Sequence, residues 1–264
     1  MRQLGGPMSR IDQRKVTVTL AITLDVDWAP DYAIEDVAQL LIDRTVKATW
    51  FATHCSPALA FLRKHADLFE VGIHPNFNPG SSHGATMSQV VSHCLELVPE
   101  AVSARSHGLI QSDYLWRHYA ESTPIQNECS TFLGHAPQVY ASRFFWRGKG
   151  ISRIPYNYQD NIEMDRPTPI WDAERFLEGK SGIQVLDFHP FYLYTNAFSM
   201  EAFESVKKIG RPFHEMPEDE LLPLRREGPG ARSMFIGLLN YLAERGGGCT
   251  MKEVASVAQS GDPV

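Results

Sequence analysis

The sequence predicts a single-domain α/β fold, namely a distorted (β/α) barrel of about seven strands with helices outside. Three observations carry this prediction. Strand-like and helix-like segments alternate along 264 residues, a length that one α/β barrel fills. The first strand-like segment, 16–24, separates small polar residues from bulky aliphatic ones. Several strand-like segments end in Asp or His, as barrel strands do at a catalytic rim.

The first strand alternates in a way that is typical of an inner barrel strand. One face carries small or polar residues, namely Thr17, Thr19, Ala21, Thr23 and Asp25. The other face carries aliphatic residues, namely Val16, Val18, Leu20, Ile22 and Leu24. Branched side chains would pack outward against helices, and small ones would fit the crowded interior. Asp25 and Asp27 would then emerge together at the carboxyl-terminal end of the strand, although a simple strand-to-loop turn also often contains Asp.

The remaining elements follow from apolar periodicity and from capping signals. Further strands are expected at 47–53, 69–73, 102–107, near Val139, at 151–156 and at 183–189. Helices are expected at 33–45, 57–66, 87–97, 112–120, 172–177, 200–209 and 231–245. The segment 125–165 is aromatic and rich in turn residues, and its pattern is the weakest. The barrel is expected to span 16–250, between an N-terminal tail at 1–15 and a C-terminal tail at 251–264.

Composition excludes several classes of partner. The formal net charge of −6 and the pI near 5.9 argue against binding nucleic acid or an anionic membrane surface. Neither the G-x-G-x-x-G nor the G-x-x-x-x-G-K-[ST] phosphate-binding pattern occurs. The N-terminus has no apolar signal-peptide core and no 18-residue apolar span exists, which predicts a cytoplasmic protein without a transmembrane segment. The four cysteines are scattered and are expected to be reduced. No oligomeric state is predicted.

Two strand ends offer metal-ligating side chains. His74 ends the 69–73 strand and Asn78 lies four residues later, so both could face an ion that Asp27 also binds; His83 is a possible substitute. A carboxylate oxygen, an imidazole nitrogen and an amide oxygen suit zinc, but also nickel, cobalt or manganese. A strand-end His that bonds a loop carbonyl, and an Asx turn at Asn78, are the ordinary structural alternatives.

Two further strands carry charged groups on one face. In 102–107, Arg105 and His107 share a face, and an inward Arg needs an acid partner, for which Asp25 is the natural candidate. In 183–189, Asp187 and His189 share a face, where the carboxylate would orient His189 or raise its pKa. A rim salt bridge and a buried His with one hydrogen bond are the simpler interpretations.

The order of these motifs resembles that of the polysaccharide deacetylases, which form carbohydrate esterase family four with the NodB-homology domain. The motifs are 23–27, Gly72 to His74 with Asn78, Arg105, and 186–189. The chain looks most similar to the divergent WbmS-like branch, which is linked to surface-polysaccharide and O-antigen biosynthesis.

The resemblance implies a metal-dependent hydrolase that removes an N-acetyl, sometimes O-acetyl, group from a sugar or polysaccharide precursor. Asp27, His74 and Asn78 would hold one divalent metal, with zinc as the first choice. Asp25 would be the general base, Arg105 would orient Asp25, and His189 would be the general acid. Substrate contacts would come from His107, Leu186 at the acetyl pocket, and Asp187.

The sequence departs from the family pattern at three points. Val26 separates the two aspartates, Asn78 stands where the family has His, and Ser106 stands where the family has Pro after the Arg. The fourth family motif lies at Asp160 or at 171–172. Two other functions stay open: a catalytically inactive barrel that binds a glycan, and an amidohydrolase that acts on a small non-sugar amide.

Overall fold

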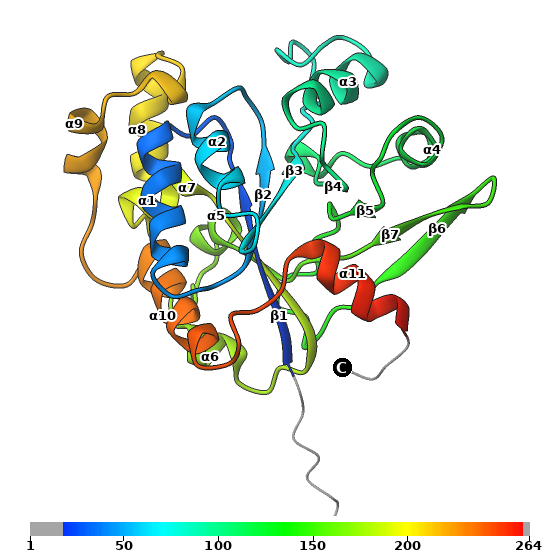
Figure 1. Cartoon of the computed structure of the whole chain (residues 1–264). Helices are drawn as coiled ribbons and strands as arrows, with labels where there is room; N and C mark the ends of the chain where they lie inside the picture. The colour runs from blue at the N-terminus through cyan, green and yellow to red at the C-terminus, as the bar shows by residue number, and fades with distance from the viewer. Residues whose placement is uncertain (1–17, 261–264) are drawn as a thin grey trace, which may run out of the picture.

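A single curved sheet of nine strands organises the chain (Figure 1). The computed structural model describes residues 18–260, so the predicted N-terminal tail, Val16, Thr17 and 261–264 lie outside the described residues. The strand order is β6-β7-β5-β4-β3-β2-β1-β9-β8, and every neighbouring pair is parallel except β6–β7. The strands are β1 (Val18–Asp25), β2 (Ala48–Ala52), β3 (Phe69–Ile73), β4 (Ser103–Ala104), β5 (Asn127–Glu128), β6 (Ser142–Trp146), β7 (Lys149–Arg153), β8 (Tyr158–Gln159) and β9 (Gly182–Phe188).

Helices cover the outer face of this sheet, as the alternation of β1 predicts. Leu20, Ile22 and Leu24 pack into one core with apolar residues of α1 (Asp31–Ile42) and α10 (Ala231–Ala243). The other helices are α2 (Pro57–Arg63), α3 (Met87–Leu97), α4 (Asp113–Ser122), α5 (Asp160–Met164), α6 (Ala173–Leu177), α7 (Pro190–Thr195), α8 (Glu201–Ile209) and α9 (Glu218–Leu221). The predicted α/β class with outer helices is confirmed, with nine strands in a half-barrel rather than about seven.

The inner face of the sheet has its own core, which α11 (Met251–Ser260) completes. Figure 1 shows α11 in red near the end of the chain. Met251, Val254 and Ala255 of this helix are buried in one cluster with Ala21 and Phe51. The expectation of a C-terminal tail from residue 251 is therefore wrong for 251–260. The three buried positions have i, i+3, i+4 spacing, which is typical of one face of an amphipathic helix.

A capping interaction begins α11. The Thr250 backbone N–H donates to the Glu253 carboxylate at 2.9 Å, and the Thr250 hydroxyl lies 3.2 Å from the same oxygen. Glu253 also pairs with Lys47 at 2.6 Å, at the amino end of β2. These contacts fix the helix to the end of the half-barrel opposite the strand ends that carry His74 and His189.

Most predicted elements are present, and most of the missed ones have six residues or fewer, apart from the ten-residue α11. β3 and α3 have the predicted bounds, whereas the segment 125–165 holds β5, β6, β8 and α5, which were not predicted. Two-residue strands have no measurable periodicity, so only neighbouring strands can define them. Val139 forms an isolated bridge to Ile183 rather than a strand. None of the described helices combines the length and apolar character needed to cross a bilayer.

We predict that Met251→Ala lowers the free energy of unfolding by about 2–5 kcal/mol, because it leaves a cavity in the inner core. Lys252→Ala is the matched control, since Lys252 is the next residue and is exposed. Urea denaturation of both variants measures the difference. A cost for Met251→Ala as small as that of the control would show that α11 contributes nothing to the inner core.

Candidate active site

The carboxyl ends of parallel strands bring the polar side chains to one rim. Asp25 is the last residue of β1, and His74, Arg105 and His189 each follow directly after β3, β4 and β9. Asp160 follows β8 and begins α5. Because these strands lie in one parallel sheet, their ends meet on the same side, which is where α/β barrels carry their active sites.

Asp27 reaches the rim through a strained turn rather than through strand alternation. β1 ends at Asp25, and the backbone of Asp27 (φ 45°) and Trp28 (φ 55°) is left-handed. The Trp28 N–H donates to the Thr53 hydroxyl at 3.0 Å, which holds this turn against the end of β2. Left-handed backbone is costly for residues other than glycine, and such strain clusters at functional sites. The turn leaves the Asp27 side chain 26% exposed, whereas that of Asp25 is 4% exposed.

Arg105 is fully buried between two acids at the centre of the rim. Its Nη1 donates to Asp25 Oδ1 at 3.0 Å, to the Thr23 hydroxyl at 2.8 Å and to Asp187 Oδ1. Its Nε donates to the Cys129 carbonyl oxygen at 3.0 Å. The predicted pairing of Arg105 with Asp25 is thus present in the structure, and Asp187 is a second partner.

Two aromatic rings enclose the Arg105 guanidinium. Its carbon lies 4.7 Å from the centroid of Phe51 and 4.3 Å from that of Tyr156. Burial lowers the pKa of Arg105, but Asp187 and Asp25 outweigh it, so the net pKa is raised and the guanidinium stays charged. Burial raises the pKa of Asp187 well above its ordinary value, because the attraction of Arg105 does not fully offset the loss of solvent.

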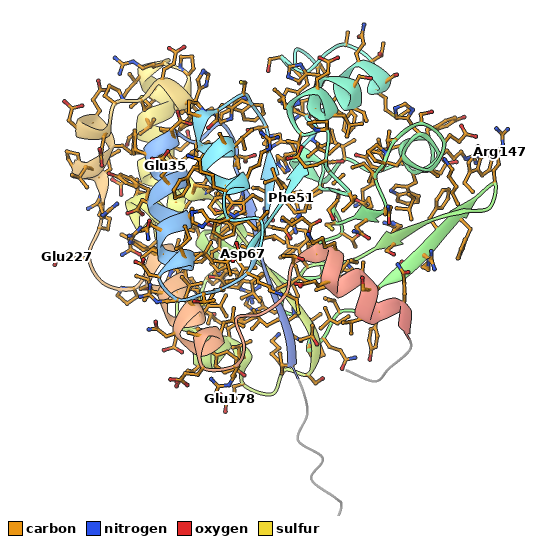
Figure 2. The ribbon with its side chains drawn as sticks, viewed as in Figure 1. Glu35, Phe51, Asp67, Arg147, Glu178 and Glu227 are labelled. Atoms are coloured by element: carbon orange, nitrogen blue, oxygen red, sulfur yellow. The ribbon has the colours of Figure 1, made fainter. Side chains whose placement is uncertain are left out.

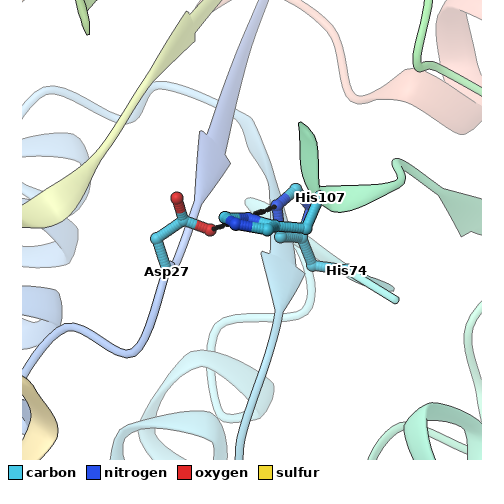
Figure 3. Close-up of side chains that lie close together, drawn as sticks. All are labelled: Asp27, His74 and His107. Atoms are coloured by element: carbon cyan, nitrogen blue, oxygen red, sulfur yellow. Dashed lines mark hydrogen bonds and ion pairs between the residues drawn. The ribbon is translucent and has the colours of Figure 1, made fainter. Parts of the chain in front are cut away.

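Three potential metal ligands converge above this network (Figure 3). Asp27 Oδ1 lies 3.1 Å from His74 Nε2 and 3.0 Å from His107 Nδ1, and the two nitrogens are 3.3 Å apart. Hydrogen bonds alone explain this triangle poorly, since two N–H groups aimed at one oxygen would bring their hydrogens together. Donor atoms that share one tetrahedral zinc ion stand about 3.3 Å apart, given bonds of about 2.0–2.1 Å. The three residues therefore fit a divalent metal.

The electrostatics of these residues also favour a cation. Burial opposes ionisation of Asp27, but hydrogen bonds from His107 and His74 outweigh it and hold the pKa of Asp27 well below its ordinary value. His74 Nδ1 is buried without a hydrogen-bond partner and lies 3.7 Å from Asp25 Oδ1. A carboxylate near the outer nitrogen is the usual companion of a metal-ligating His.

His189 stands on the other side of Asp27 and is held by Asp160. Asp160 Oδ1 lies 2.6 Å from His189 Nδ1, and Asp160 Oδ2 accepts from the His189 backbone N–H at 2.9 Å. Burial lowers the pKa of His189, but Asp160 outweighs it and raises the net pKa to about 10. His189 Nε2 lies 3.5 Å from Asp27 Oδ2. Of the two positions considered for the fourth motif, Asp160 lies in the site, whereas Asp172 accepts from the Arg175 N–H at the start of α6.

A cavity of about 360 Å³ opens above these groups. Its wall includes Asp25, Asp27, His74, His107, His189, Gln159 and Asn161. A cavity of this size and polarity suits part of a sugar together with its acyl substituent.

The structure does not bring every predicted site residue to this cavity. Asn78 is exposed and lines a neighbouring cavity, and His107 takes the third place beside Asp27 and His74. His83 Nδ1 accepts from the Asn76 N–H and its Nε2 lies 2.7 Å from the Thr53 carbonyl oxygen, so both ring nitrogens are engaged.

Two predicted substrate contacts lie behind the cavity wall. Leu186 packs into the outer core, and Asp187 is buried beneath Arg105. The alternation of β9 explains the position of Leu186, because neighbouring residues on a strand face opposite sides of the sheet. Asp187 shares the inner face with His189 but pairs with the buried Arg105. The signal for His107 was present in its shared face with Arg105, but its role depends on the distance to His74, which no sequence pattern encodes.

A family model described as WbmS-like polysaccharide deacetylase matches residues 22–207, which is more than half of the chain. The chain belongs to this family. The WbmS-like resemblance in the motif order is thereby confirmed.

Solved structures are similar to this chain to different degrees. A crystal structure from Bordetella bronchiseptica, described as a polysaccharide deacetylase involved in O-antigen biosynthesis, is 29% identical with a TM-score of 0.70, covering 84% of this chain and 90% of that chain. The peptidoglycan deacetylase PdaC from Bacillus subtilis is 10% identical with a TM-score of 0.46, covering 92% and 91%. A family 4 acetyl xylan esterase from Clostridium thermocellum, in complex with cobalt, is 13% identical with a TM-score of 0.44, covering 91% and 91%. No match was found among curated proteins.

We predict that Arg105→Met lowers the free energy of unfolding by about 3–5 kcal/mol, because it leaves Asp25 and Asp187 buried without a cation. The matched control is Arg147→Met, at the tip of the β6–β7 hairpin, where the side chain is 75% exposed (Figure 2). Urea denaturation near neutral pH reports both values. Equal costs in the two variants would show that Arg105 does not balance the buried acids.

Proposed function

We propose that the protein is a metal-dependent hydrolase that removes an N-acetyl or O-acetyl group from a sugar or surface-polysaccharide precursor. The observation that carries this proposal is the convergence of Asp27, His74 and His107 between Asp25 on one side and His189 on the other. Membership of the polysaccharide deacetylase family supports the same reaction class.

Asp27, His74 and His107 would hold one divalent metal, with zinc the best match to one carboxylate and two imidazoles. When bound, such an ion polarises the acyl carbonyl and makes a water molecule more acidic. The proposal replaces Asn78 with His107 as the third ligand, since Asn78 is exposed and lines the neighbouring cavity, whereas His107 lines the catalytic one. An imidazole also binds zinc more strongly than a neutral amide does.

Asp25 would act as the general base. It lies on the cavity wall, and its Oδ1 accepts from Arg105 at 3.0 Å, which fixes the carboxylate while leaving the other oxygen for a water proton. Arg105 is a positioning residue, because it is buried beneath Asp25 and does not line the cavity. General-base assistance of this kind is worth about 10²–10⁴-fold in rate.

His189 would act as the general acid. Its raised pKa of about 10 keeps the ring protonated at neutral pH, and Asp160 orients it so that Nε2 faces the cavity. After water attacks the acyl carbon, this proton would pass to the leaving nitrogen as the C–N bond breaks. A catalytically inactive glycan-binding barrel has no need of a protonated His held in this way, so the His189–Asp160 pair favours the enzyme.

We predict that His107→Ala loses the metal and that Asn78→Ala keeps it, because His107 and not Asn78 contacts Asp27 and His74. Each purified variant is incubated with zinc, freed of excess and measured by elemental analysis. About one equivalent is expected in the wild type and in Asn78→Ala. Metal retained by His107→Ala and lost by Asn78→Ala would contradict the ligand assignment and support the family's usual spacing.

We predict that Asp25→Asn keeps the metal but slows acetate release from N-acetylated amino-sugar glycosides at least about 100-fold, because the base is lost and the ligands remain. Asp27→Ala is the comparison and should lose both metal and turnover. Wild-type rates in Asp25→Asn would remove Asp25 from the role of base. Metal without turnover in the wild type on every sugar tried would support the glycan-binding alternative.

A further inference from the structure

A second cavity adjoins the catalytic cavity, between the loop after β3 and the loop after β4. Its volume is about 470 Å³, and apolar side chains dominate its wall: Phe77, Met87, Val90, Ile110 and Leu115. The catalytic roles described above do not use this cavity. It is large enough to receive a substantial part of a substrate.

Three side chains on this wall are polar, namely Asn78, Thr86 and Ser112, and the two hydroxyl oxygens each accept a backbone N–H in a helix cap. The Thr86 hydroxyl accepts from the Gln89 N–H at the start of α3, and the Ser112 hydroxyl accepts from the Leu115 N–H at the start of α4. Phe77 is the aromatic ring on the wall, and the other apolar groups are aliphatic. Apolar side chains outnumber these three polar ones, so this surface suits a hydrocarbon chain better than a sugar, whose hydroxyl groups need several partners.

The two cavities meet at Asn78 and Gly108. Gly108 lines the catalytic cavity and Asn78 the second one, and Asn78 Nδ2 lies 3.9 Å from the position that a Gly108 Cβ would take. Along the chain, His107 to Leu109 face the catalytic cavity and Ile110 faces the second. A ligand that leaves the active site past His107 would therefore approach the apolar cavity at Ile110.

The position of His189 indicates which part of the substrate lies there. Asp27 Oδ2 faces His189, whereas Asp27 Oδ1 faces His74 and His107, so the proposed acid and the second cavity lie on opposite sides of this carboxylate. A general acid must face the leaving nitrogen, which carries the sugar. The acyl group then points away from His189, toward His107 and the second cavity.

We propose that the second cavity binds the acyl chain of the substrate, so that the enzyme prefers N-acyl sugars whose chains are longer than acetyl. This inference rests on the proposed function: it keeps the same site and the same amide hydrolysis, and it extends the acyl group that is removed beyond acetyl. The reaction is the same hydrolysis: a C–O bond forms between the acyl carbon and water, the C–N bond breaks, and a fatty acid and a protonated amine are released. No further co-reactant is needed.

The test compares kcat/KM for N-acetyl, N-butanoyl and N-hexanoyl glucosamine, with release of the free amine as the common readout. One buried CH₂ contributes about 0.8 kcal/mol, which corresponds to a gain of about fourfold. We expect the hexanoyl substrate to exceed the acetyl substrate by at least about tenfold. An equal or falling series would overturn the proposal.

Two variants fill the cavity from opposite walls, namely Ala85→Trp and Ile110→Trp. Both should reduce the hexanoyl-to-acetyl ratio toward one. Ile209→Trp on α8 is the matched control, because Ile209 is also an exposed isoleucine and does not line the cavity, and it should keep the wild-type ratio. A ratio that stays high in both filled variants would overturn the assignment of the chain to this cavity.

Two further measurements distinguish the acyl-chain site from a site for the sugar side and from a protein without hydrolase activity. Methyl and hexyl glycosides of N-acetylglucosamine test the sugar side, and a rate that rises with the glycoside chain instead of the acyl chain would overturn the proposal. If no substrate releases amine, the proposed function fails, and calorimetric binding of N-acetyl and N-hexanoyl glucosamine decides the cavity separately. Tighter binding of the hexanoyl compound, lost in Ala85→Trp, would support the chain site; equal affinities would overturn it.

Discussion

The buried ion pair of Arg105 with Asp25 and Asp187 is the interaction on which the rest of the rim depends. It joins β1, β4 and β9 through one guanidinium, which aromatic rings shield from solvent. Charges buried in this way are tolerated only when they are paired and hydrogen-bonded. The same contact that stabilises the sheet therefore also fixes the direction of the proposed base.

The functional groups are arranged in layers above this ion pair. Arg105 and Asp187 lie beneath the cavity, Asp25 lies at its floor, and Asp27, His74 and His107 form the group that faces the substrate. The left-handed turn at Asp27 makes this possible, because it brings a second carboxylate to the rim two residues after Asp25 without extending β1. On the opposite side, α11 fills the inside of the half-barrel, so the cavity has a closed base.

The sequence predicted those features that local periodicity and strand order encode. The alternation in β1 indicated both faces of the sheet, and the shared face of Arg105 and His107 indicated an inward cation that needs an acid partner. The third metal ligand was assigned to Asn78 because the family spacing within one loop favoured it. His107 follows a different strand, β4, and only the distance across β3 and β4 shows that it lies beside His74.

Other differences have similar causes. Asp160 follows a two-residue strand that has no periodicity of its own, so its place beside His189 depends on the pairing of β8 with β9. The family resemblance predicts Leu186 at the acetyl pocket, yet Leu186 lies on the face of β9 that packs into the outer core. The second cavity is formed by two loops whose Pro, Gly and Ser residues carry no signal for the space between them.

The most direct test of the account is anomalous diffraction at the zinc absorption edge from crystals of the zinc-loaded protein. The account predicts one strong peak bonded to Asp27 Oδ1, His74 Nε2 and His107 Nδ1, with Asn78 outside bonding distance. A peak bonded to Asn78 in place of His107, or the absence of a peak in this triangle, would contradict it.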